Sequence, residues 1–119
     1  MKVIIAGSRT ITDMAILVQA ISDSGFAITE VVSGGASGVD TLGEQWADEN
    51  GVGVRLFRAD WDRHGKAAGP IRNCQMAGYA DALITLWDGK SRGTQDMIYQ
   101  ARLKGLKVFG VVVRGGGDR

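Results

Sequence analysis

Residues 28–43 have the sequence ITEVVSGGASGVDTLG, and this stretch decides the fold. Its first part, Ile28 to Val32, has the apolar, β-branched character of a buried strand. A glycine-rich loop follows over residues 33–38. After the loop, the spacing of a helix face is kept by Val39, Leu42, Gly43 and Trp46. A strand, a glycine loop and a helix in this order form the repeating unit of parallel α/β folds.

The same unit recurs on both sides of this stretch. Strands are predicted over residues 3–6, 28–32, 52–57, 82–87 and 106–113. Helices are predicted over residues 14–24, 39–50, 70–79 and 94–104. The first is expected to be capped by Asp13 or Thr12, with Leu17 and Val18 on its inner face, and the second to be capped by Ser37. Residues 59–69 are expected to form a longer polar loop, and Trp46 and Cys74 to pack in the core.

Near-continuous apolar strands are typical of a parallel sheet that helices cover on both faces. We therefore expect an α/β, Rossmann-like three-layer sandwich in which all five strands are buried. Right-handed crossovers give the strand order 3-2-1-4-5. One domain is expected over residues 1–113, followed by a flexible, glycine-rich tail over 114–119.

Three glycine-bearing loops follow predicted strands, at 7–9, 33–38 and 88–94. The carboxyl ends of parallel strands share one rim, where open α/β sheets bind ligands. Glycine allows backbone N–H groups to approach an anion, and each loop leads into a predicted helix N-terminus. The loops therefore predict a site for a phosphorylated ligand.

Composition limits the possible functions. The chain has 119 residues, 45% of them hydrophobic, and a net charge of +1, which argues against strong non-specific binding to nucleic acid. It has one cysteine and one histidine, so neither a disulfide nor a zinc site is expected. No signal peptide or membrane-spanning run is evident, and a cytoplasmic location is expected.

Charge is concentrated at the predicted rim. The basic residues in or beside its loops are Arg9, Arg63, Lys66, Arg72, Lys90 and Arg92. Trp61 and Trp87 follow or end predicted strands, where an indole stacks on a base or covers the core edge. His64 is a candidate phosphate donor or a solvent-exposed loop residue.

Two common phosphate motifs are absent. A dinucleotide fingerprint needs G-x-G-x-x-G after the first strand and an acidic residue ending the second. Gly7 is instead followed by Ser8 and Arg9, and the second strand leads into Ser33 and Gly34. No G-x-x-x-x-G-K-[ST] occurs, so the chain has no Walker A loop either.

Four short elements occur together in this chain. They are Gly7-Ser8-Arg9, the SGGASGVD element at 33–40, Pro70-Ile71-Arg72-Asn73 with Met76 and Ala80 to Leu83, and Gly93-Thr94. In these elements the chain resembles the SLOG superfamily, which includes DNA-processing protein A and the Lonely Guy phosphoribohydrolases. The resemblance covers about residues 2–113 and points to a small YspA-type member.

The resemblance implies a Rossmann-like fold that binds nucleotides or their derivatives, including NAD- or ADP-ribose-type and cyclic nucleotide signals in bacterial and phage conflict. It also implies pairing into a homodimer or higher homo-oligomer. Lonely Guy enzymes use an arginine, matched by Arg72, and a glutamate, where this chain has Met97. We therefore expect a non-enzymatic sensor or sequestering protein.

Two alternatives remain open. One is an N-glycosidase acting on nucleoside 5′-monophosphates, with Arg72, Asp96 and Asp88 as catalytic candidates. The other is a single-stranded DNA binder. No cofactor or metal is predicted beyond a nucleotide-type ligand. The predicted ligand-binding residues are Gly7, Ser8, Arg9, Ser33, Gly34, Gly35, Ser37, Gly38, Asp40, Trp61, His64, Lys66, Arg72, Asn73, Trp87, Asp88, Ser91, Arg92, Gly93 and Thr94.

Overall fold

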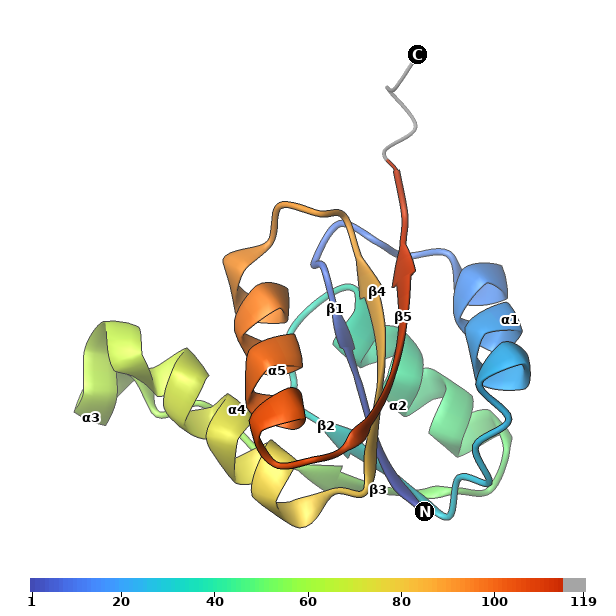
Figure 1. The fold of residues 1–119 in the computed structure, drawn as a ribbon, viewed down its shortest axis with the longest axis horizontal. Coiled ribbons are helices and arrows are strands. Elements are labelled where there is room, and N and C mark those ends of the chain that lie inside the picture. Colours follow the sequence, from blue (N-terminus) through green and yellow to red (C-terminus); the bar gives the residue numbers. More distant parts are fainter. Residues whose placement is uncertain (115–119) are drawn as a thin grey trace.

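A computed structural model describes residues 1–114 and contains one five-stranded parallel sheet (Figure 1). Its strands are β1 (Lys2–Gly7), β2 (Glu30–Ser33), β3 (Gly53–Leu56), β4 (Ala82–Trp87) and β5 (Lys107–Val112). Their order is β3-β2-β1-β4-β5, so the predicted fold class and order are confirmed. Only the first residue of the predicted tail, Arg114, lies within the described residues. No helix of residues 1–114 is long and apolar enough to cross a membrane.

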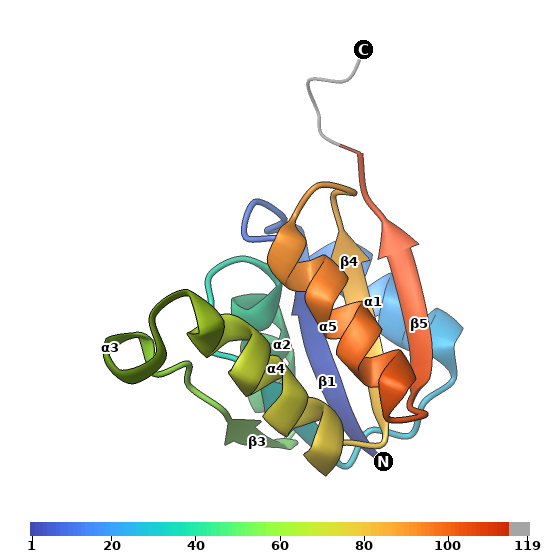
Figure 2. The ribbon, with the colours of Figure 1, turned by 60° about the vertical axis from the view of Figure 1, so that its left-hand side comes forward.

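Helices cover both faces of the sheet (Figures 1 and 2). Two helices, α1 (Met14–Ser24) and α2 (Val39–Glu49), enclose one core layer with Val3, Ile5 and Ile84. On the opposite face, α4 (Ala68–Tyr79) and α5 (Arg92–Leu103) enclose a second layer. This three-layer arrangement leaves the loops at the strand ends free to build a site.

The position of each strand in the sheet decides its burial. β1 and β4 are central, and Ile4, Leu83 and their apolar neighbours are fully buried. β3 lies at the edge, and all four of its residues are exposed. No residue of β5, at the opposite edge of the sheet, is fully buried either. The expectation that every strand is buried is therefore wrong for the two edge strands, β3 and β5, because each has a neighbouring strand on one side only.

The predicted loop over 59–69 is largely helical. It forms the short helix α3 (Trp61–His64) and the 3₁₀ turn η1 (Gly65–Ala67), and α4 then begins at Ala68. The carboxylate of Asp60 caps α3 by accepting a hydrogen bond from the Arg63 N–H at 3.1 Å. Polar composition predicted a loop here because a four-residue helix leaves no periodic apolar pattern.

Three local predictions are wrong and one is confirmed. α2 is preceded by Gly38 rather than capped by Ser37, because the backbone there has φ +75°. Val18 is 47% exposed and Cys74 is also exposed, since both lie on outer helix faces. Asp13 does cap α1, by accepting from the Ala15 N–H at 3.0 Å.

Candidate functional site

Three adjoining cavities open where β1, β2 and β4 end, and we call them together the rim cleft. A small cavity of about 80 Å³ lies between Ala6, Met76 and Met97. Larger hollows of about 550 Å³ and 350 Å³ lie beside it, and both are lined by Trp61. Arg9 and Arg72 line all three cavities, so the rim cleft is organised around two guanidinium groups.

Arg72 is held in place by its neighbours. It projects from α4, and its Nη1 donates to the Gly34 carbonyl at 2.6 Å while its Nε donates to Asn73 Oδ1 at 3.1 Å. Within residues 1–114 these bonds leave Nη2 without a protein acceptor. Burial lowers the pKa of Arg72 below its ordinary value; nearby Asp40 opposes this effect and the charge of Arg9 adds to it. The group is thus partly desolvated and preorganised, a state that favours pairing with an anion.

Gly34 is necessary for that arrangement. A Cβ at this position would come within 2.6 Å of Arg72 Nη1 and 3.0 Å of an Asp40 carboxylate oxygen. The glycine therefore lets the second loop lie directly against the guanidinium, which the sequence pattern alone did not indicate.

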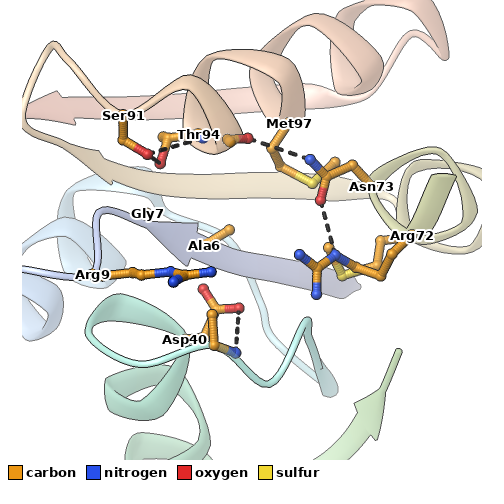
Figure 3. A pocket seen from close by; sticks show the side chains of 12 residues that line it. Ala6, Gly7, Arg9, Asp40, Arg72, Asn73, Ser91, Thr94 and Met97 are labelled. Atoms are coloured by element: carbon orange, nitrogen blue, oxygen red, sulfur yellow. Dashed lines mark hydrogen bonds between the residues drawn. The ribbon is translucent and has the colours of Figure 1, made fainter. Parts of the chain in front are cut away.

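Arg9 comes from the loop after β1 and faces Arg72. Figure 3 shows the two guanidinium groups pointing toward one another across the small cavity, with Asp40 nearby. The backbone of Arg9 packs against Gly38, and the Val39 N–H donates to the Ser8 carbonyl at 3.4 Å. The first two loops are therefore locked together through backbone contacts.

Asp40 lies in the first turn of α2 and is only 5% exposed. Burial raises its pKa from the ordinary 3.8 to about 6, although the Ala36 N–H and the charge of Arg72 act in the opposite direction and Glu44 adds to the rise. The Ala36 N–H donates to the carboxylate at 3.3 Å. Asp40 thus balances part of the positive charge of the rim cleft at neutral pH.

The free energy of unfolding of Asp40→Asn, relative to that of the wild type, is expected to increase as the pH rises. Between about pH 4 and 6 folded Asp40 keeps a proton that the unfolded chain has lost, so the wild type loses stability through this window. A pKa shift from 3.8 to about 6 corresponds to about 3 kcal/mol of unfolding free energy. The uncharged amide of the variant does not titrate, so the variant does not lose this free energy. Urea unfolding at several pH values from 4 to 8 measures the difference, with Asp48→Asn on the exposed face of α2 as control. A variant-minus-wild-type difference that stays constant with pH would contradict this.

The third loop builds the N-terminus of α5. The Asp88 carboxylate accepts from the N–H groups of Lys90 and Ser91, both at 2.8 Å, and these bonds lower its pKa. Ser91 then caps the helix by accepting from the Thr94 N–H at 3.3 Å. The tight turn directs the positive end of the α5 dipole toward the rim cleft.

Asn73 links this helix to α4. It is 5% exposed, and its Nδ2 donates to Asp96 Oδ2 at 2.9 Å and to the Gly93 carbonyl at 3.3 Å. Since its Oδ1 accepts from Arg72, one buried amide fixes the orientation of both an arginine and a carboxylate. Figure 3 shows the bond to Arg72.

Most of the predicted site residues meet in the rim cleft. Its lining includes Gly7, Arg9, Gly34, Gly35, Ser37, Asp40, Trp61, Lys66, Arg72, Asn73, Asp88, Ser91, Arg92, Gly93 and Thr94. Asp96, a catalytic candidate, lines the 550 Å³ hollow, and Met97 lines the small cavity.

Five predicted residues do not line these three cavities: Ser8, Ser33, Gly38, His64 and Trp87. Three of them instead form hydrogen bonds that hold the loops in place. The Ser8 hydroxyl accepts from the Asp88 N–H at 2.9 Å, the Ser33 hydroxyl donates to Glu44 at 2.6 Å, and the Trp87 indole donates to the Ser91 carbonyl at 3.0 Å. Gly38 packs on the first loop, and His64 ends α3.

Sequence reasoning missed Arg58, Thr10 and the two methionines as lining residues. Arg58 follows β3 closely, so the strand-end argument could have found it. For Met97 the signal was the resemblance, which matched this position to a catalytic glutamate, whereas apolar side chains in helices otherwise indicate core packing. Arg63 and Lys90, counted among the rim cations, do not line the cleft. No group of three or more metal-ligating side chains occurs in the part of the chain that the structure describes.

Comparison with known proteins gives consistent matches. A family model described as "YspA, cpYpsA-related SLOG family" matches residues 1–64. The Gene 61 protein of Mycobacterium phage D29 is 37% identical over 119 aligned positions, covering 91% of this chain and 94% of that protein. The fold is similar to DNA processing protein A (DprA) from Streptococcus pneumoniae, with a TM-score of 0.74, 21% identity and 92% of this chain covered. The match spans about half (49%) of the DprA chain.

Proposed function

Since this chain belongs to the YspA, cpYpsA-related SLOG family, we propose that it binds a nucleotide or nucleotide-derived anion in the rim cleft, as a sensor or sequestering protein. The observation that carries the proposal is the convergence of Arg9 and Arg72 on one small cavity. Two cations facing the same hollow repel each other. Asp40, in the same cavity, balances part of their charge, and a bound phosphate would balance the rest.

The phosphate subsite is the small cavity. It has about 80 Å³, enough for a phosphate, and it is lined by Gly93 and Thr94 at the start of α5. Backbone N–H groups and the helix dipole at this end favour an anion. Among the residues that the structure describes, Nη2 of Arg72 has no acceptor, so it can donate to such an anion.

The nucleoside occupies the 550 Å³ hollow, whose volume is typical of small-molecule sites. Trp61 lines it and is 54% exposed, which is unusual for an indole and leaves a ring face for stacking. Lys66 and Arg92 line the same hollow and add positive charge for further phosphates. These features support nucleotide-derived signals over simple phosphate.

Binding without hydrolysis is favoured by Met97. Its side chain is 1% exposed and lines the small cavity, where it offers no group for proton transfer or for stabilising an oxocarbenium ion. Of the carboxylates at the larger hollow, Asp88 is engaged by the turn, and Asp96 lines that hollow rather than the small cavity. Single-stranded DNA is the weaker candidate, because the net charge is only +1. Self-association stays a prediction, as does a role in conflict signalling.

A ligand panel tests the proposal. AMP, ADP, ADP-ribose, cyclic AMP and an oligothymidylate are each added to the purified protein, and the melting temperature is recorded. A nucleotide at a hundredfold excess over its Kd should stabilise the fold by about 2.7 kcal/mol. A folded protein with no shift in any arm refutes the proposal, and a shift with the oligothymidylate alone supports the DNA alternative. Free base released on long incubation with AMP would establish the N-glycosidase alternative.

A further inference from the structure

The 550 Å³ hollow proposed for the nucleoside is lined by acidic as well as basic side chains. The 550 Å³ hollow is lined by four cations, Arg9, Lys66, Arg72 and Arg92, and by two carboxylates, Asp88 and Asp96. Asp40, in the small cavity, lies within the field of Arg72, which offsets its charge. Beside a carboxylate that no cation offsets, a ligand must offer hydrogen-bond donors rather than phosphate oxygens. The two carboxylates therefore need separate explanations.

Asp88 is explained by its own loop. Its Oδ1 accepts two backbone N–H bonds that form the turn before α5, so its role is structural. Asp96 has no such role. Its Oδ2 accepts from Asn73 at 2.9 Å, but within residues 1–114 its Oδ1 has only Gln100 Nε2 at 3.5 Å, the limit of a hydrogen bond. A carboxylate has about four acceptor positions, so about two of those on Asp96 are available to a ligand.

The position of Asp96 relative to the phosphate subsite indicates which ligand group it meets. Asn73 bonds to both Arg72 and Asp96, so a single side chain separates the phosphate-facing guanidinium from the carboxylate. In a nucleoside 5′-phosphate the group next to the phosphate is the ribose, and the base is farther away. The ribose carries two neighbouring hydroxyl donors, and a carboxylate is the side chain that commonly accepts them.

We propose that Asp96, oriented by Asn73, accepts hydrogen bonds from the ribose hydroxyls, an inference that rests on the proposed function. The site is then selective for ribonucleotides over 2′-deoxyribonucleotides. A deoxyribose leaves one acceptor position of a partly buried carboxylate unpaired, and sites that bind a hydroxyl reject analogues that lack it. Asp96 is then a specificity-determining residue.

Isothermal titration with AMP, 2′-deoxy-AMP and IMP tests this inference. The wild type should bind AMP at least 10-fold more tightly than 2′-deoxy-AMP, and IMP about as tightly as AMP. Asp96→Ala should weaken AMP binding and reduce the AMP preference to less than about 3-fold. Gln95→Ala, an exposed neighbour on α5, is the matched control and should keep the preference. Melting temperatures verify that each variant is folded, and Asp96→Asn replaces the alanine variant if that one is not.

Each other outcome counts against the inference. Equal binding of AMP and 2′-deoxy-AMP by the wild type overturns it and leaves the proposed function standing. A preference that survives the loss of the Asp96 carboxylate also overturns it. Discrimination against IMP that disappears in Asp96→Ala would mean that the carboxylate contacts the base amino group instead. Failure of both AMP and 2′-deoxy-AMP to bind overturns the inference for mononucleotides, while the wider panel separately decides the proposed function.

Discussion

Gly38→Ala is expected to lower the free energy of unfolding by at least about 3 kcal/mol, because it combines backbone strain with a steric clash. Gly38 has φ +75° and ψ −125°, a conformation that residues with a Cβ avoid. An added Cβ would lie 2.5 Å from Arg9 Cα and from the carbonyl oxygens of Ser8 and Arg9. All three are backbone atoms, so the contact is relieved only by separating the first two loops. Thermal unfolding should show a loss of roughly 10 °C.

Gly25→Ala is the matched control for this prediction. Gly25 also has positive φ, +69°, but an added Cβ would meet nothing within 4 Å. Its substitution should lower the free energy of unfolding by only about 1 kcal/mol, because the strain of a positive φ is then the single contribution. Equal losses for the two variants would contradict the steric argument and would mean that the loops are not held together by close packing at Gly38.

Arg72→Met is expected to weaken binding of a phosphorylated nucleotide by at least about 100-fold, equivalent to about 3 kcal/mol. The substitution removes the charge and the donors that face the small cavity while keeping an apolar stem of similar length. The free energy of unfolding should fall by less than the binding free energy, because removal of a partly desolvated charge offsets the two lost hydrogen bonds. Titration calorimetry with the tightest nucleotide of the panel measures the change in Kd, and urea unfolding measures the change in stability.

Three companion variants make this result specific. Arg63→Met removes the same charge from an exposed position outside the rim cleft and should change Kd less than about 3-fold. Arg72→Lys keeps the charge but loses the planar donor arrangement, and should fall between the two. Gly34→Ala leaves Arg72 in the chain but places a Cβ 2.6 Å from Nη1, so it should weaken binding by displacing the guanidinium. If Arg72→Met and Arg63→Met bind equally well, the phosphate subsite is misplaced.

Much of the fold was predictable from local patterns. Apolar strands, helix-face spacing and terminating residues such as Gly25 predicted five parallel strands and the order 3-2-1-4-5, which are confirmed. Burial of individual strands was not predictable in the same way. β3 has strand-like residues but lies at the sheet edge, and its exposure depends on which strand pairs with which.

The candidate site was predictable in outline for a similar reason. Glycine loops after parallel strands must share one rim, so the sequence alone predicted that Arg9 and Gly34 lie near one another. The roles of Ser8 and Trp87 were not, because a loop hydroxyl or indole can face a ligand or a neighbouring loop with the same sequence signal. Only the packed structure shows Ser8 bonded to the Asp88 backbone and Trp87 bonded to Ser91.

The sequence by itself determined the parallel sheet, the glycine-lined rim and the presence of cations there, because these follow from hydrophobic periodicity and from the conformational freedom of glycine. Tertiary structure alone decided which cations converge and which polar groups remain available to a ligand. Burial raises the pKa of Asp40, and Asn73 joins Arg72 to Asp96 across two helices. Desolvation and hydrogen bonding between distant segments depend on distances in space, which spacing along the chain does not specify.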